Sequence, residues 1–170
     1  TGHALHSTVF YQTAQFAKIG APYDCFLLDD LGKMPDYRLY LFPDTFYADK
    51  GRIRAIHEKL RKNNATALWL YAPGFCDGET LSLEHMEELT GIRLGCLDVE
   101  AVVRIRVCGK SGHPVTAEIP GDLLFGGEAS SPSNKGFQIQ HPNMPLRPVF
   151  YARDPRATTL GTMNVGDRQA

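Results

Sequence analysis

A cysteine and two carboxylates follow an apolar segment near the middle of the chain and could act together in catalysis or ligand binding. The apolar segment spans residues 67–72, and Cys76, Asp77 and Glu79 come shortly after it. An almost continuous apolar run is typical of a strand covered on both faces, as in a parallel sheet. Open α/β sheets bind ligands beyond the carboxyl ends of their strands. The sequence therefore predicts a ligand crevice formed by Pro73, Gly74, Phe75, Cys76, Asp77 and Glu79.

Cys76 is the strongest candidate for a catalytic residue. Enzymes of the class I glutamine amidotransferase type place a nucleophilic cysteine on a tight turn between a strand and a helix, with small residues on either side. Here the bulky Phe75 precedes Cys76, and Ser82 is the better start for the next helix. These departures favour an inactive turn over a nucleophile.

A reactive thiolate also needs support from a helix N-terminus or a histidine. His85 is the nearest histidine in sequence, but it falls inside the predicted helix. A distant histidine, His113 or His141, could still approach Cys76 in space. The sequence therefore leaves open a cysteine-dependent enzyme that uses Cys76 with His113 or His141.

The carboxylates have a second chemical interpretation, as the acid and base of a glycosidase. Such a pair must face each other across a sugar at about 5 to 9 Å, whereas Asp77, Glu79 and Glu84 lie beside a helix start. Carboxylates in that position are usually caps and dipole partners. The four cysteines, at positions 25, 76, 96 and 108, lack the spacing of metal ligands. We expect neither a metal site nor a cofactor, and we expect Cys25 and Cys108 to be buried.

Composition excludes several classes of protein. The 170 residues carry a net charge of -1 and are 43% hydrophobic, which is ordinary for a globular chain. A nucleic-acid-binding protein would show a basic stripe, and a membrane helix would need about 20 apolar residues in a row. We therefore expect no nucleic-acid partner and no membrane span. No signal peptide is recognisable, and the sequence leaves the cellular compartment open.

Helices and strands are expected to alternate over roughly the first 92 residues. Helices are predicted at 4–19, over about 14 residues between an Asp49 cap and Asn63-Asn64, and at 83–90 between Ser82 and Gly91. Strands are predicted at 25–28, 37–42 and 66–72. This alternation predicts an α/β fold with a flavodoxin-like, mostly parallel sheet and helices on both faces.

The second half has a different character, beginning at about residue 95. Residues 99–107 alternate between apolar and charged side chains, which indicates a half-exposed strand. Residues 115–119 are predicted to return as its partner, and 137–140 and 148–152 as two further strands. We interpret the whole chain, 1–170, as one domain with a β-rich insertion at about 95–150.

Residues 20–92 resemble the amidotransferase-like domain of large bacterial β-galactosidase-like proteins. The domain is similar to the trimerisation domain of family 42 glycoside hydrolases. The segments that carry the resemblance are GAPYD at 20–24, LDDL at 28–31, PDYRLYLFPDTFY at 35–47, LWLYAPG at 68–74 and MEELTGI at 86–92. From 95 to 170 the fit is loose.

The resemblance implies a flavodoxin-like domain that lacks the amidotransferase machinery and contributes to contacts between copies of the protein. It also implies a larger multidomain parent, in which a barrel domain outside this chain carries any glycosidase carboxylates. The favoured hypothesis is thus a non-catalytic accessory or oligomerisation domain in carbohydrate metabolism. The two alternatives are the Cys76 enzyme and a sugar-binding or small-molecule-binding module at residues 73–79.

Overall fold

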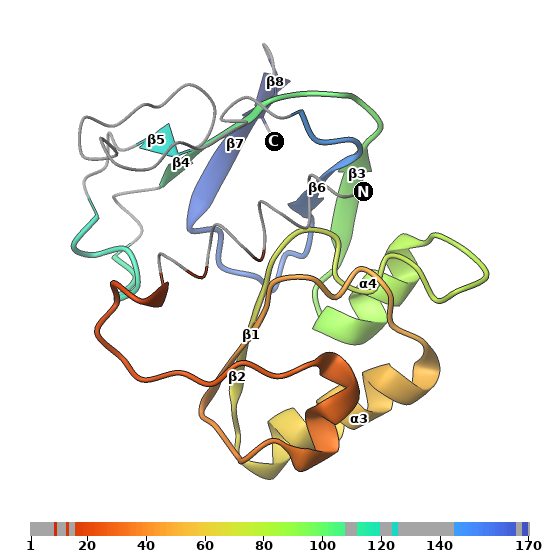
Figure 1. Cartoon of the computed structure of the whole chain (residues 1–170). Coiled ribbons are helices and arrows are strands. Elements are labelled where there is room, and N and C mark those ends of the chain that lie inside the picture. The colour runs from red at the N-terminus through yellow and green to blue at the C-terminus, as the bar shows by residue number, and fades with distance from the viewer. Residues whose placement is uncertain are drawn as a thin grey trace. The chain divides into compact units, whose positions relative to one another are not determined.

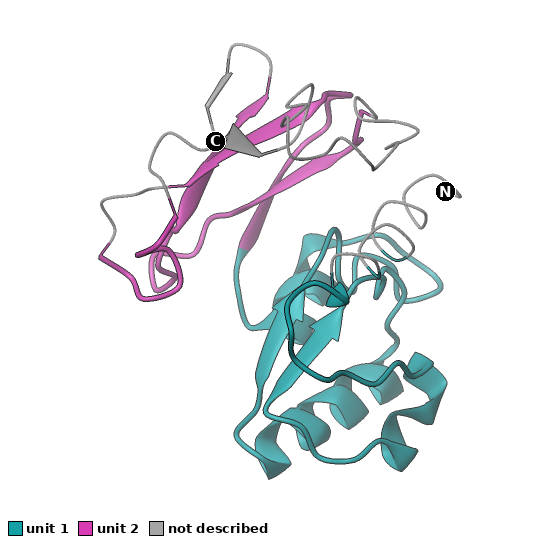
Figure 2. Ribbon diagram, turned by 60° about the vertical axis from the view of Figure 1, so that its left-hand side comes forward, with its two compact units in different colours: residues 1–93 teal, residues 94–170 magenta. Residues whose placement is uncertain are grey.

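The computed structural model describes residues 9, 13, 16–107, 112–119, 124–125, 145–165 and 168–169. Its helices and small sheets, with parallel and antiparallel strands, form an α/β-type fold (Figure 1). The chain divides into two compact units, Thr1–Arg93 and Leu94–Ala170 (Figure 2). This boundary falls where the sequence changes character. That both units form one domain stays a prediction.

The first unit is built on a strand–helix–strand segment. Strands β1 and β2 pair in parallel, with Leu39 opposite Thr66 and Phe42 opposite Trp69. In chain order the elements are the 3₁₀ helix η2 (Leu28–Lys33), β1 (Leu39–Phe42), α3 (Lys50–Lys62), β2 (Thr66–Trp69) and α4 (Leu83–Thr90). Both helices and both strands lie within ranges predicted from the sequence.

The two helices begin and end at the predicted residues. The Asp49 side chain accepts a hydrogen bond from the Arg52 backbone N–H at the start of α3. The Ser82 hydroxyl accepts hydrogen bonds from the backbone N–H groups of Glu84 and His85 at the start of α4. Gly91 ends α4 with a φ of 72°, a left-handed conformation that glycine adopts without steric cost. Capping of both helices is confirmed.

The core of the first unit lies on one face of the β1–β2 pair. Tyr40 and Phe42 point to this face, and the Phe42 and Trp69 rings stack with centroids 4.3 Å apart. The buried residues of this cluster are Leu31, Tyr40, Phe42, Ala48, Ile53, Ile56 and Leu89. One residue from η2, two from α3 and one from α4 therefore cover the same side of the sheet.

The prediction that the central strand is covered on both faces is wrong. The β2 strand ends at Trp69, and the face opposite the core leaves Leu39 61% exposed and Leu68 51% exposed. Side chains alternate across a strand, so this face carries a leucine stripe that η2, α3 and α4 do not cover.

The predicted strand at 25–28 is also wrong. Residues 22–27 have no regular secondary structure, and Cys25 is exposed instead of buried. The Tyr37 hydroxyl donates to the Asp24 carboxylate over 2.5 Å, and the Phe26 and Tyr37 rings approach to 6.4 Å. Among the described residues this segment pairs with no strand. Side-chain contacts hold it in place before η2 begins.

The second unit is β-rich, in agreement with the change of character after about residue 95. Its strands are β3 (Leu94–Leu97), β4 (Val103–Val107), β5 (Leu124–Phe125), β6 (Val149–Ala152), β7 (Gly161–Val165) and β8 (Arg168–Gln169). The β3 strand pairs with β6, and a second antiparallel sheet has the order β5-β4-β7-β8. The β4 and β6 strands lie within predicted ranges, whereas β3 and β7 were not predicted.

Residues 115–119 do not return as a partner of β4. They form turns, in which the Thr116 N–H donates to the His113 carbonyl over 2.9 Å, and Val115 is 69% exposed. The β4 strand pairs with β5 and β7 instead. The predicted strand at 137–140, Cys108 and most of the predicted helix at 4–19 lie outside the described residues.

Candidate functional site

The turn that follows β2 has an unusual backbone. Ala72 has a φ of 55° and is only 1% exposed. A residue with a Cβ atom pays a steric cost of about 1 to 3 kcal/mol in this region. Nucleophiles are held on a similarly strained backbone in sharp strand-to-helix turns, although here the next helix begins only at Leu83. The strained position here carries a methyl group and no nucleophile.

Gly74 brings this turn into close contact with α4. Its N–H donates to the Thr45 carbonyl over 2.7 Å, and its φ is 70°. A Cβ atom at this position would lie 2.9 Å from Leu89 Cδ2 and 3.3 Å from the His85 carbonyl oxygen. Pro73 and Gly74 are buried. Two of the residues predicted to line a crevice are therefore packed inside the first unit.

Cys76 lies in paired, extended backbone and not on a turn into a helix. Its N–H donates to the Phe46 carbonyl over 3.0 Å, and its carbonyl accepts from the Ala48 N–H over 2.9 Å. It forms β-bridges with Tyr47 and Leu81. The α4 helix begins only at Leu83, so its N-terminus is not formed by the residues that directly follow the thiol.

Neither of the two histidines proposed as bases for Cys76 belongs to the first unit. His113 belongs to the second unit, where its Nδ1 accepts a hydrogen bond from the Val115 N–H over 3.2 Å. His141 lies outside the described residues. The pairing of Cys76 with either histidine stays a prediction.

Asp77 stabilises the loop between Cys76 and α4. Its Oδ1 accepts hydrogen bonds from the N–H groups of Glu79 and Thr80 at 2.9 and 2.8 Å. Its Oδ2 lies 3.3 Å from His85 Nε2. The backbone hydrogen bonds from Thr80 and Glu79, together with the charge of His85, lower the pKa of Asp77. Glu79 is exposed. The Asp77 carboxylate therefore caps the turn, a role that is typical of an acidic residue near a helix start.

The contact between Asp77 and His85 was not predicted from the sequence, which indicated only that His85 lies inside a helix. His85 Nδ1 is buried and has no hydrogen-bond partner among the described residues. Glu84 is likewise committed to the helix start, because the Ser82 hydroxyl donates to its Oε2 over 2.6 Å. This hydrogen bond lowers the pKa of Glu84. Asp77 and Glu84 therefore support local structure.

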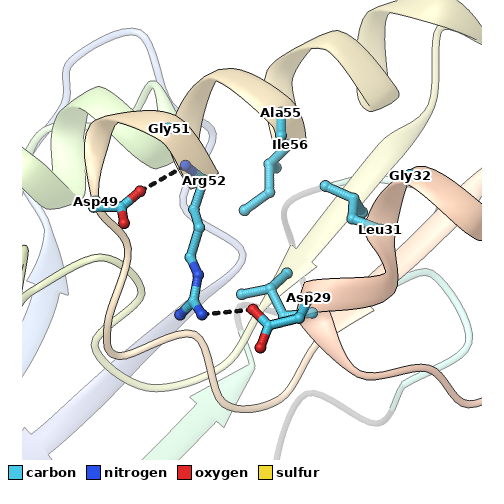
Figure 3. Close-up of a pocket in the computed structure, with 9 residues that line it drawn as sticks. Asp29, Leu31, Gly32, Asp49, Gly51, Arg52, Ala55 and Ile56 are labelled. Carbon is cyan, nitrogen blue, oxygen red and sulfur yellow. Dashed lines mark hydrogen bonds and ion pairs between the residues drawn. The ribbon is translucent and has the colours of Figure 1, made fainter.

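A cavity of about 370 Å³ lies elsewhere in the first unit, between η2 and the N-terminal half of α3 (Figure 3). None of residues 73–79, the predicted crevice, lines it. Its walls are formed by Leu28, Asp29, Leu31, Gly32, Asp49, Gly51, Arg52, Ala55 and Ile56. The predicted crevice and the observed cavity are therefore different places on the same unit.

Arg52 is the central polar side chain of this cavity. Figure 3 shows it extending from α3 to Asp29 on η2, and its Nη2 donates to Asp29 Oδ1 over 2.5 Å. The guanidinium carbon also lies 4.7 Å from the centre of the Tyr47 ring. A carboxylate and an aromatic face thus hold one cation in place.

Asp49 closes the polar side of the cavity. Its Oδ1 accepts from the Arg52 N–H over 2.8 Å, and its Oδ2 accepts from the Tyr47 hydroxyl over 3.0 Å. The backbone hydrogen bond from Arg52, followed by the Tyr47 hydroxyl, lowers the pKa of Asp49. The same contact with Asp49 raises the pKa of Tyr47.

Comparisons with protein-family models, with curated proteins and with solved structures gave no match. The family resemblance therefore stays an expectation, and function has to be argued from geometry. Within the described ranges, no helix has the length and apolar character that crossing a membrane requires. The same residues contain no group of three or more histidine, cysteine or acidic side chains that could hold a metal ion.

Proposed function

We propose that the chain is a non-catalytic, amidotransferase-like domain with a flavodoxin-like fold, which serves the assembly of a glycoside-hydrolase-like protein in carbohydrate metabolism. The observation that carries the proposal is the turn after β2. Ala72 has a left-handed backbone, with a φ of 55°, of the kind that holds a nucleophile in an active turn, but its methyl group can do no chemistry and no helix follows before Leu83.

The surroundings of Cys76 support the same proposal. Cys76 is the only cysteine near this turn in sequence, and both its backbone N–H and its carbonyl are bonded in extended structure. The Asp77 carboxylate that follows it is already bonded to two backbone N–H groups. Its other oxygen, Oδ2, lies 3.3 Å from His85 Nε2, so this carboxylate links the loop to α4.

The open face of the β1–β2 pair supports a role in assembly. Parallel sheets are almost always covered on both faces, whereas Leu39 and Leu68 are 61% and 51% exposed here. In the parallel register Leu41 lies opposite Leu68, so Leu39, Leu41 and Leu68 share this face. We propose that a second copy of the protein covers it. Any glycosidase carboxylates would then lie on a barrel domain outside these 170 residues.

Light scattering tests this role. The chain is expected to have a solution mass above the 18.9 kDa of a single copy. Replacing Leu68 by lysine places a charge on the leucine face, and we expect the mass to fall to that of one copy because burying an unpaired charge is costly. Leu27→Lys is a matched control, since Leu27 is 73% exposed but precedes η2 and lies outside the two strands.

The control is expected to keep the oligomer mass. The assembly role is wrong if the unmodified chain scatters as a single copy at every concentration. It is equally wrong if Leu68→Lys and Leu27→Lys give the same mass as the unmodified chain. Circular dichroism of each variant establishes that it is folded before its mass is compared.

A further inference from the structure

The cavity between η2 and α3 combines an apolar floor with a polar edge. Leu31 and Ile56 form part of the floor and are 6% and 0% exposed, so their positions are fixed by the core. Leu28 and Ala55 extend the apolar lining. The volume of about 370 Å³ falls within the range of roughly 300 to 1,000 Å³ that is usual for small-molecule sites.

The polar edge retains unused hydrogen-bonding groups of both kinds. Arg52 uses its Nη2 on Asp29, whereas its Nε and Nη1 make no hydrogen bond to the described residues. Asp29 accepts that bond on Oδ1, and its Oδ2 has no hydrogen-bond partner among the described residues. A donor and an acceptor of opposite charge therefore lie side by side at the edge of an apolar hollow.

The charges around the cavity disfavour an anionic ligand. Two carboxylates, Asp29 and Asp49, face one guanidinium, Arg52, so the lining has a net charge of about -1 at neutral pH. The N-terminus of α3, which would otherwise attract an anion, is already capped by Asp49. An ammonium group on Asp29 Oδ2 would lie beside the Arg52 guanidinium, so repulsion between like charges disfavours a cationic ligand as well.

We propose that this cavity binds a neutral polyhydroxylated small molecule, of the size of a monosaccharide or a cyclitol, through Arg52 and Asp29. One hydroxyl accepts a hydrogen bond from the Arg52 guanidinium, and its neighbour donates to Asp29 Oδ2. The C–H face of the ring packs on Leu28 and Ala55, the apolar lining residues that keep accessible surface above the buried Leu31 and Ile56. Neutral vicinal hydroxyls satisfy both groups at once without adding charge. The site does not depend on the proposed assembly role.

Saturation-transfer difference NMR on the full chain tests the proposal with glucose and myo-inositol as neutral probes. Glucuronate and glucosamine are the anionic and cationic counterparts of glucose. We expect saturable binding of at least one neutral probe. Because the lining is acidic, we expect glucuronate to bind about tenfold more weakly than glucose, and glucosamine no more tightly than glucose.

Three variants locate the binding. Arg52→Gln and Asp29→Asn each remove one charged hydrogen-bonding partner and should weaken binding by about tenfold. Ala55→Phe fills the hollow without touching either charge and should abolish binding. Arg54→Gln is the matched control, because Arg54 is an exposed arginine of α3 that does not line the cavity. Its affinity should equal that of the unmodified chain.

The proposal is overturned if neither neutral probe gives a saturable signal with the unmodified chain. It is also overturned if glucuronate or glucosamine binds more tightly than glucose. The same holds if Arg54→Gln weakens binding as much as Arg52→Gln. If Arg52→Gln proves poorly folded, Ala55→Phe alone decides, since retained binding in a folded Ala55→Phe chain places the ligand elsewhere.

Discussion

Replacing Ala72 by valine is expected to lower the free energy of unfolding by about 3 kcal/mol. Two effects add at this position. Ala72 has a φ of 55°, a conformation in which a β-branched side chain is strained far more than alanine. Ala72 is also only 1% exposed, so two additional methyl groups must be forced into a packed interior. Urea-induced unfolding followed by circular dichroism measures the loss.

Ala55→Val is the matched control for this substitution. Ala55 lies on α3 and is exposed, so the change there should cost only the lower helix propensity of valine, less than about 1 kcal/mol. Ala72→Gly should be close to neutral, because relief of the backbone strain offsets the loss of one buried methyl group. If Ala72→Val costs no more than Ala55→Val, the turn after β2 does not have the backbone described here.

Replacing Leu89 by alanine is the second substitution with a large expected effect, about 2 to 5 kcal/mol in the free energy of unfolding. Leu89 is 2% exposed and belongs to the same buried cluster as Phe42 and Ile56. It is also the side chain against which Gly74 packs, so its removal leaves a cavity beneath the turn after β2. The same denaturation measurement applies.

Leu81→Ala removes the same atoms from the surface, since Leu81 is 60% exposed. Its cost should stay within about 0.5 kcal/mol. A Leu89→Ala variant as stable as Leu81→Ala would mean that α4 does not hold the turn. Such a result would remove the packing argument for the buried positions of Pro73 and Gly74.

The helices of the first unit could be predicted because their signals are local. Asp49 and Ser82 are capping residues one step before an apolar periodicity, and Gly91 ends such a periodicity. Strand β1 could also be predicted, because an apolar run ends at Pro43. Each of these signals lies within a few residues of the structure that it specifies.

Burial of the strand faces could not be read from residue type. Leu68 and Phe42 are both apolar, yet Leu68 is 51% and Phe42 6% exposed, and a sequence cannot tell which face of a strand will be covered. The β3 strand was missed because Gly95 and Cys96 are weak indicators of a strand. In the structure Gly95 lies beneath the Tyr151 ring, where a Cβ atom would come within 2.4 Å of Cζ. That reason for a glycine becomes visible only once β3 and β6 are paired.

The side chains of the candidate sites were predicted least well, because their contacts join distant segments. Arg52 and Asp29 are 23 residues apart, and no spacing rule links them. Alanine is rarely found at positive φ, so Ala72 gave no signal of the turn that it occupies.

Release of ammonia from glutamine is the measurement that tests most directly whether this turn is without a catalytic nucleophile. The unmodified chain and a Cys76→Ser variant are compared with buffer alone under the same conditions. We predict that both proteins release ammonia no faster than the buffer control, because the strained backbone after β2 is at Ala72, which has no nucleophilic group, and Cys76 lies in paired backbone. Release by the unmodified chain that is lost in Cys76→Ser would contradict the non-catalytic role and establish the cysteine-dependent enzyme.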